Sequence, residues 1–140
     1  MVTRQLLLAS VAILAIAYTN CASSTGGDPT MTEVQRMRSG ALDIVLLART
    51  DALRQTRNYC ALEFRAGTDR HLVDVGTVRV RTTMSMEGVP MNGFVTDVKR
   101  VGTGRYEVEM VMAMAGTWQI SVEWEGAAGT GSAMFEALVP

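Results

Sequence analysis

The stretch "RYEVEMVMAMAGTWQISVEWEG" (residues 105–126) decides the fold, because apolar and polar side chains alternate along it on both sides of Gly116. The alternating apolar positions are Tyr106, Val108, Met110, Met112, Met114, Trp118, Ile120, Val122 and Trp124. Most positions between them carry glutamate or another polar side chain. A period of two is typical of half-buried β-strands. This stretch therefore predicts two strands, over 105–114 and 118–126, joined by a turn.

The same period of two continues on both sides of this stretch. Further strands are expected over residues 41–48, 58–67, 76–84, 93–101 and 132–139. Glycines mark several of the links, and no long helical pattern interrupts them. About seven short strands in roughly 100 residues predict an all-β fold, an antiparallel immunoglobulin-like β-sandwich. A closed barrel is the alternative architecture.

The N-terminus has the layout of a bacterial export signal. Arg4 is the only charged residue before residue 28, and an apolar run over residues 6–17 follows it. That run is too short for a comfortable membrane span. Two cleavage sites compete. The sequence "AIA" (residues 15–17) fits an ordinary signal peptidase, whereas "AYTNC" (residues 17–21) resembles a lipobox, in which the cysteine becomes the lipidated N-terminus.

We favour lipidation of Cys21. This choice divides the chain into a signal peptide (1–20), a lipid-anchored tether (21–40) and a β-sandwich domain (41–140). The tether opens with Gly- and Ser-rich residues, and residues 31–38 read either as a short capped helix or as an irregular approach to the first strand. Because the lipid would hold the protein on a membrane, we expect a lipoprotein of the periplasm or cell envelope.

Charge and cysteine usage argue against several function classes. The sequence has 13 Lys and Arg against 14 Asp and Glu, a formal net charge of −1. It has no basic block, so nucleic acid is not an expected partner. Cys60 lies on an apolar strand face, where a thiol is inert, and it would pair with Cys21 only if cleavage follows Ala17. His71, the one histidine, lies in a polar turn, and no motif joins it to Cys60. We therefore expect no enzymatic activity.

The stretch "TTMSMEGVPM" (residues 82–91) places three methionines within ten residues. Thioether sulfur is a soft, uncharged ligand that prefers Cu(I). Met84 and Met86 also share the parity of the apolar Val78 and Val80, so they could equally fill the core. If the strands after Thr77 are consecutive antiparallel neighbours, this stretch lies at the same end of the sandwich as Met112, Met114 and Trp118.

Two longer segments resemble the YtkA-like (FixH-related) domain. They are "VDVGTVRVRTTMSMEGVPMNG" (residues 73–93) and "VGTGRYEVEMVMAMAGTWQISVEW" (residues 101–124), and the resemblance extends over residues 42–139. It implies an extracytoplasmic β-sandwich, found beside copper or heavy-metal efflux and cytochrome oxidase assembly systems, with no established catalytic activity. The positions that match the family's methionine loop are Met84, Met86 and Met91. Those that match its structural signature are Gly104, Arg105, Tyr106, Gly116 and Trp118.

Two functional hypotheses follow. In the first, a membrane-tethered accessory domain binds Cu(I) for copper handling or efflux. It uses Met84, Met86 and Met91 as ligands, with Trp118, Met112 and Met114 as accessory residues, and its partners are metal-efflux or oxidase-assembly proteins. In the second, the domain binds no metal and is a protein-interaction module of an envelope or transport complex, because a methionine-rich surface adapts to many partners.

Overall fold

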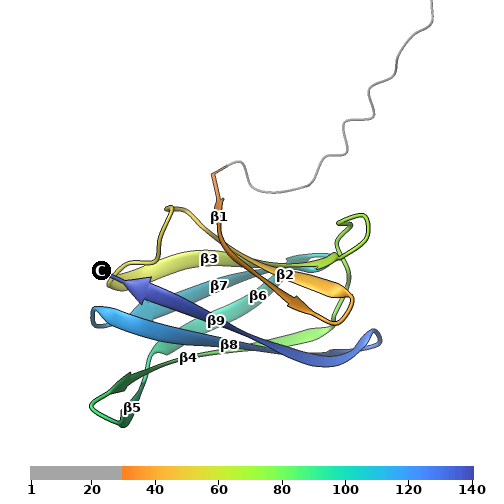
Figure 1. Ribbon diagram of the computed structural model, residues 1–140. Helices are drawn as coiled ribbons and strands as arrows, with labels where there is room; N and C mark the ends of the chain where they lie inside the picture. Colours follow the sequence, from red (N-terminus) through yellow and green to blue (C-terminus); the bar gives the residue numbers. More distant parts are fainter. Residues whose placement is uncertain (1–29) are drawn as a thin grey trace, which may run out of the picture.

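All seven strands expected from the alternating pattern are present in the computed structural model, which describes residues 30–140, and two further strands join them (Figure 1). In chain order the strands are β1 (Thr32–Ser39), β2 (Leu42–Ala48), β3 (Thr56–Ala66), β4 (Thr77–Met86), β5 (Val89–Asn92), β6 (Phe94–Gly102), β7 (Arg105–Met112), β8 (Gly116–Gly126) and β9 (Gly129–Val139). The expected signal segment, the start of the tether and Cys21 lie outside the described residues.

Two antiparallel sheets pack as an immunoglobulin-like sandwich. One sheet has the strand order β1-β2-β3-β7-β6, and the other has the order β5-β4-β8-β9. The expectation that strands after Thr77 are consecutive neighbours is wrong at two places, because the chain changes sheets between β5 and β6 and again between β7 and β8. A sandwich needs such crossings, since each sheet must bury one face against the other.

The segment after Thr30 forms a strand and not the short helix considered from the sequence. β1 pairs antiparallel with β2 from Thr32↔Ala48 to Ser39↔Leu42, with a bulge between Glu33 and Gln35. Tertiary pairing prevails here because an isolated helix of this length is marginal in water. β1 also brings residues 32–39, which the sequence had assigned to the tether, into the first sheet.

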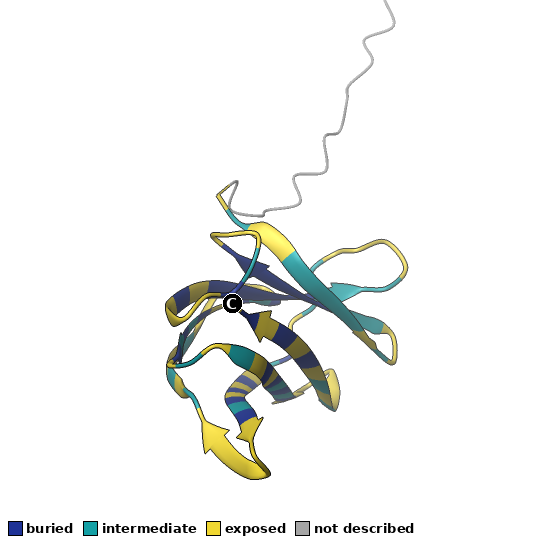
Figure 2. Cartoon of the chain, turned by 60° about the vertical axis from the view of Figure 1, so that its left-hand side comes forward, coloured by how far each residue is buried: buried dark blue, intermediate teal, exposed yellow. Residues whose placement is uncertain are grey.

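The core lies between the two sheets and consists of the alternating apolar positions. Buried and exposed residues alternate along β9 in Figure 2, as they do along β4, β7 and β8. Three aromatic rings anchor the centre. Phe64 meets Tyr106 edge-on with ring centroids 5.6 Å apart, and it meets Trp124 at 5.2 Å. Such edge-to-face pairs contribute about 1 kcal/mol each beyond the area they bury.

A buried ion cluster lies on the outer face of the five-stranded sheet. Glu63 in β3 is buried although its neighbours Leu62 and Phe64 point into the core. Arg105 Nη1 donates to Glu63 Oε1 at 2.7 Å, and Arg65 Nε donates to Oε2 at 2.8 Å. Both carboxylate oxygens are therefore paired, which a buried charge requires.

Within the described residues no helix is long and apolar enough to cross a membrane.

Candidate metal site on the methionine hairpin

The methionine-rich stretch is a two-stranded hairpin formed by β4 and β5. Its turn is Glu87-Gly88, and both residues have positive φ, 50° and 82°. Positive φ at both central positions is the pattern of a two-residue type I′ turn, which matches the right-handed twist of the flanking strands. The sequence had indicated only a loop here, so β5 is an addition to the expected fold.

The hairpin register brings the three predicted ligands to one face. Met84 pairs directly with Met91, and Met86 pairs with Val89. Residues directly opposite each other in an antiparallel pair share a face, and residues two apart in a strand do so as well. Met84, Met86 and Met91 therefore point to the same side of the hairpin.

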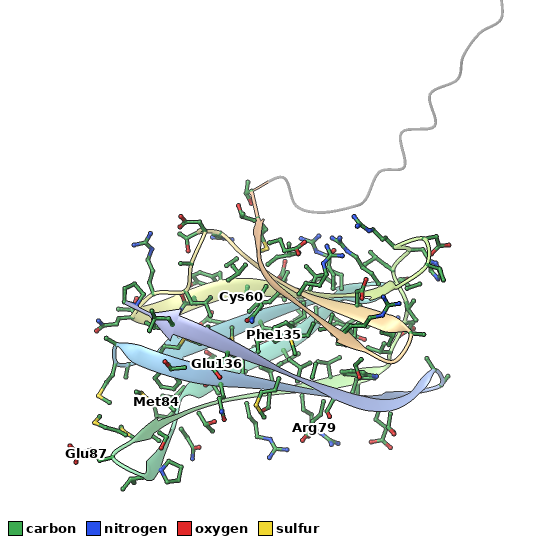
Figure 3. The ribbon with its side chains drawn as sticks, in the orientation of Figure 1. Cys60, Arg79, Met84, Glu87, Phe135 and Glu136 are labelled. Carbon is green, nitrogen blue, oxygen red and sulfur yellow. The ribbon has the colours of Figure 1, made fainter. Side chains whose placement is uncertain are left out.

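These three side chains differ in exposure. Met84 is 7% exposed, whereas Met86 is 41% and Met91 is 36% exposed. The difference arises because the β4–β8 pairing reaches only to Met84↔Trp118, so the rest of the hairpin is no longer hydrogen-bonded to β8. Figure 2 shows the hairpin as an exposed projection, and Figure 3 shows Glu87 at its tip with Met84 closer to the sheet. Met84 therefore has the predicted core position, but Met86 does not.

The expected accessory residues lie at the same end but belong mainly to the core. Trp118 and Met112 are buried, while Met114 is half-buried and packs against the core. The Trp118 indole Nε1–H donates to the Met114 carbonyl at 3.0 Å. Strand counting had predicted that these residues lie at the end of the sandwich that carries Met84, and the Met84↔Trp118 pairing confirms this for Trp118.

A shallow pocket of about 250 Å³ adjoins the root of the hairpin. The lining residues are Thr83, Met84, Ser85, Pro90, Thr117 and Gln119. None of these side chains carries a charge, so the pocket has no electrostatic preference for an anion or for a hard cation. The one carboxylate of the turn, Glu87, lies at the exposed tip.

Cys60 and His71 do not form a second site. Cys60 is a buried free thiol, and burial raises its pKa to about 12, which makes it a poor nucleophile. His71 is exposed in the turn after β3, where its Nδ1 lies 2.5 Å from Asp69 Oδ1. No group of three or more His, Cys, Asp or Glu side chains within residues 30–140 is arranged to hold a metal ion.

Two features at this end of the molecule were not predicted from the sequence. The first is Gly93, which links β5 to β6 and packs against Trp118. The second is Thr82, whose hydroxyl is buried and finds no hydrogen-bond partner among the described residues. The glycines and proline of "GVPMNG" indicate that Gly93 lies in or near a turn. The sequence around Gly93 and Thr82 does not indicate which residues pack against them.

Comparison with known proteins identifies the family. The model of the YtkA-like family matches residues 42–123, which is more than half of the chain. A search of curated proteins finds no match. Among solved structures, FetP of uropathogenic E. coli strain F11, expressed in the periplasm of E. coli, aligns with 7% identity over 76% of this chain and 93% of that chain, at a TM-score of 0.43. On the strength of the family match, the chain belongs to the YtkA-like family.

Proposed function

We propose that this protein is an extracytoplasmic accessory domain that binds Cu(I) through the thioethers of the β4–β5 hairpin. The observation that carries the proposal is the register, which sets Met84 directly opposite Met91 with Met86 two residues further along the same face. Opposite Cβ atoms lie about 5 Å apart and diagonal ones about 7–8 Å, a span that long methionine side chains bridge. Soft thioether ligands without charge select Cu(I) over hard cations.

Exposure assigns different roles to the three sulfurs. Met86 and Met91 are open to solvent and would be the exchangeable ligands, whereas Met84 would complete the site from the edge of the core. Two or three neutral ligands at the surface favour transient binding, which suits a carrier or a delivery protein better than a storage site. We therefore place the domain in copper handling or efflux, with metal-efflux or oxidase-assembly proteins as partners.

Membrane attachment through lipid on Cys21 fits this role. The described chain begins at Thr30, and in Figures 1 and 2 this end lies on the opposite side of the sandwich from the hairpin. A tether that leaves from that end keeps the methionine face accessible. The intact mass of protein extracted from membranes tests the anchor, because lipidation of Cys21 removes residues 1–20 and adds acyl chains, whereas cleavage after Ala17 leaves an unmodified N-terminus.

Cu(I) competition titrations test the metal site. The protein is purified after export and titrated under reducing conditions against a weak Cu(I) chelator. The double variant Met86→Leu/Met91→Leu keeps the apolar volume and removes both exposed sulfurs, so it should lose competition. Met84→Leu should weaken binding. Met134→Leu is the matched control, because Met134 is 51% exposed on β9 outside the hairpin. Equal competition by the double variant and the control would refute the site.

A second candidate function is a protein-interaction module without metal. The observation that favours it is the exposure of two further apolar side chains, Val89 at 62% opposite Met86 in the hairpin and Phe94 at 71% where the chain leaves the hairpin for β6. The two functions respond differently to substitution. Leucine at the two methionines preserves an apolar docking surface, whereas Val89→Ser/Phe94→Ser removes it and leaves every sulfur. Retention of an envelope partner by the leucine variant together with its loss by the serine variant would favour this function.

A further inference from the structure

The root of the hairpin is a close-packed junction around Gly93. The Gly93 N–H donates to the Thr82 carbonyl at 2.8 Å, which continues the hairpin ladder to the point where the chain leaves for the other sheet. A Cβ built on Gly93 would lie 2.2 Å from Thr82 Oγ1, 2.9 Å from Trp118 Cζ3 and 3.1 Å from the Val111 carbonyl oxygen. Strands β4, β7 and β8 therefore all contact this glycine, and a larger residue would fit only if neighbouring side chains moved.

Trp118 connects this junction to the methionines. Its ring edge lies against Gly93, its N–H is bound to the Met114 carbonyl at 3.0 Å, and its backbone pairs with Met84. The Met84 methyl group in turn lies against Gly116, where an added Cβ would be 2.8 Å from Cε. One indole thus contacts the hairpin root and also fixes the turn between β7 and β8.

The hairpin needs such support because β5 has only four residues and, within residues 30–140, pairs only with β4. An isolated two-stranded hairpin is marginally stable in water. Every contact that orders β5 before a ligand arrives lowers the entropic cost of binding. The register that sets Met84 opposite Met91 therefore depends on how firmly the root is held.

We infer that Trp118 is a positioning residue for the methionine hairpin, with Gly93 as the surface on which its ring rests. The consequence for Cu(I) rests on the proposed function, but the positioning itself is a property of the metal-free protein. Trp118 supplies no ligand atom, because its indole N–H is a donor only and is bound to the Met114 carbonyl.

The first variant is Trp118→Phe in the full-length exported protein. Phenylalanine keeps an aromatic side chain in the core but removes the N–H, so the Met114 carbonyl loses its partner, and it also removes the ring edge that meets Gly93. Hydrogen exchange at the Gly93 amide reports on the hairpin root without metal, and we expect it to be about tenfold faster in the variant. Amides of β2 and β3 in the other sheet should keep their wild-type rates, because a local opening does not need global unfolding.

The second variant is Gly93→Ala, whose new methyl group would collide with the Thr82 hydroxyl and with the ring edge of Trp118, so that both side chains must move. Gly102→Ala is the matched control, since a Cβ at Gly102 would meet nothing within 4 Å. We expect Gly93→Ala, like Trp118→Phe, to weaken Cu(I) binding about tenfold, whereas the control should bind as the wild type does. A merely structural role would accelerate exchange throughout β8 and β9 and leave the Cu(I) affinity of the folded protein unchanged.

The outcomes separate this inference from the proposed function. If the wild type binds Cu(I) and both variants bind it with wild-type affinity, the positioning role is wrong and the proposed metal site stands. If the wild type binds no Cu(I), the proposed function is wrong, and the hydrogen-exchange rate of the Gly93 amide alone tests the positioning role. Faster exchange confined to the hairpin in both variants then supports the positioning role, and wild-type rates overturn it.

Discussion

The buried hydroxyl of Thr82 allows a quantitative prediction of folding stability. Thr82 points inward from β4 next to Gly93, and its Oγ1 has no hydrogen-bond partner among the described residues. A buried polar group without a partner costs about 1–3 kcal/mol of folding free energy. Thr82→Val replaces the hydroxyl by a methyl group of similar size and retains the β-branched shape that strands favour. We therefore expect the variant to be more stable by about 1 kcal/mol.

That gain corresponds to a rise in Tm of roughly 4 °C for a domain of about 110 residues. Urea unfolding followed by tryptophan fluorescence measures it directly. Thr83→Val is the control, because Thr83 is the next residue on the opposite face and is half-exposed. Water can reach this side chain, so the change should stay within about 0.5 kcal/mol. If Thr82→Val destabilises the protein by 1 kcal/mol or more while the control is neutral, the hydroxyl has a partner in solution and the reasoning fails.

Three further predictions concern groups away from the hairpin. Glu63→Ala leaves Arg65 and Arg105 without their shared carboxylate, so unfolding experiments should show a loss of about 3 kcal/mol; a loss below 1 kcal/mol would mean that the cluster is hydrated. Native Cys60, buried with a pKa of about 12, should react with a thiol reagent at pH 8 only as fast as the protein unfolds, and rapid labelling of the folded protein would contradict this. The backbone N–H of Gly76, together with Arg100, lowers the pKa of Asp74. The charged form is therefore favoured in the native state, and its contribution to stability is present above the unfolded pKa and disappears as pH falls through the folded pKa. Asp74→Asn should accordingly show a weaker acid destabilisation than the wild type, and identical acid limbs would refute it.

The alternation of apolar and polar residues predicted most of the strands, but it did not predict β1 and β5, in which the alternation is absent. A regular alternation marks β4, β7, β8 and β9, and their burial patterns follow it along most of each strand, with β4 departing from it at Met86. The bulge between Glu33 and Gln35 breaks the alternation in β1. β5 is four residues long and contains Pro90, so no period can be read from it. Short and irregular strands form because a partner strand is available, and that is not a local property of the sequence.

The burial of Glu63 was not predicted by the alternating pattern either, for a different reason. Alternation placed it on the face opposite Leu62, where a carboxylate is expected to be hydrated. The structure buries it because Arg65 follows two residues later in the same strand and Arg105 lies directly opposite in β7. The first partner is visible in the sequence, but the second is 42 residues away and becomes a neighbour only through the sheet order.

The register sets the three methionines of the candidate site on one face of the hairpin, but parity alone would have assigned Met86 to the wrong environment. Met84 and Met86 stand on the same face of β4, so a period of two predicts equal burial for both. Their burial differs because the pairing of β4 with β8 ends at Met84↔Trp118, although β8 itself begins two residues earlier, at Gly116. Beyond that position Gly116 and Thr117 pair with β9 and not with β4. The exposure of a thioether in this fold therefore depends on where the pairing between two neighbouring strands ends. We expect a change that continued the β4–β8 pairing to Met86↔Gly116 to bury more of Met86 without altering any residue of the hairpin.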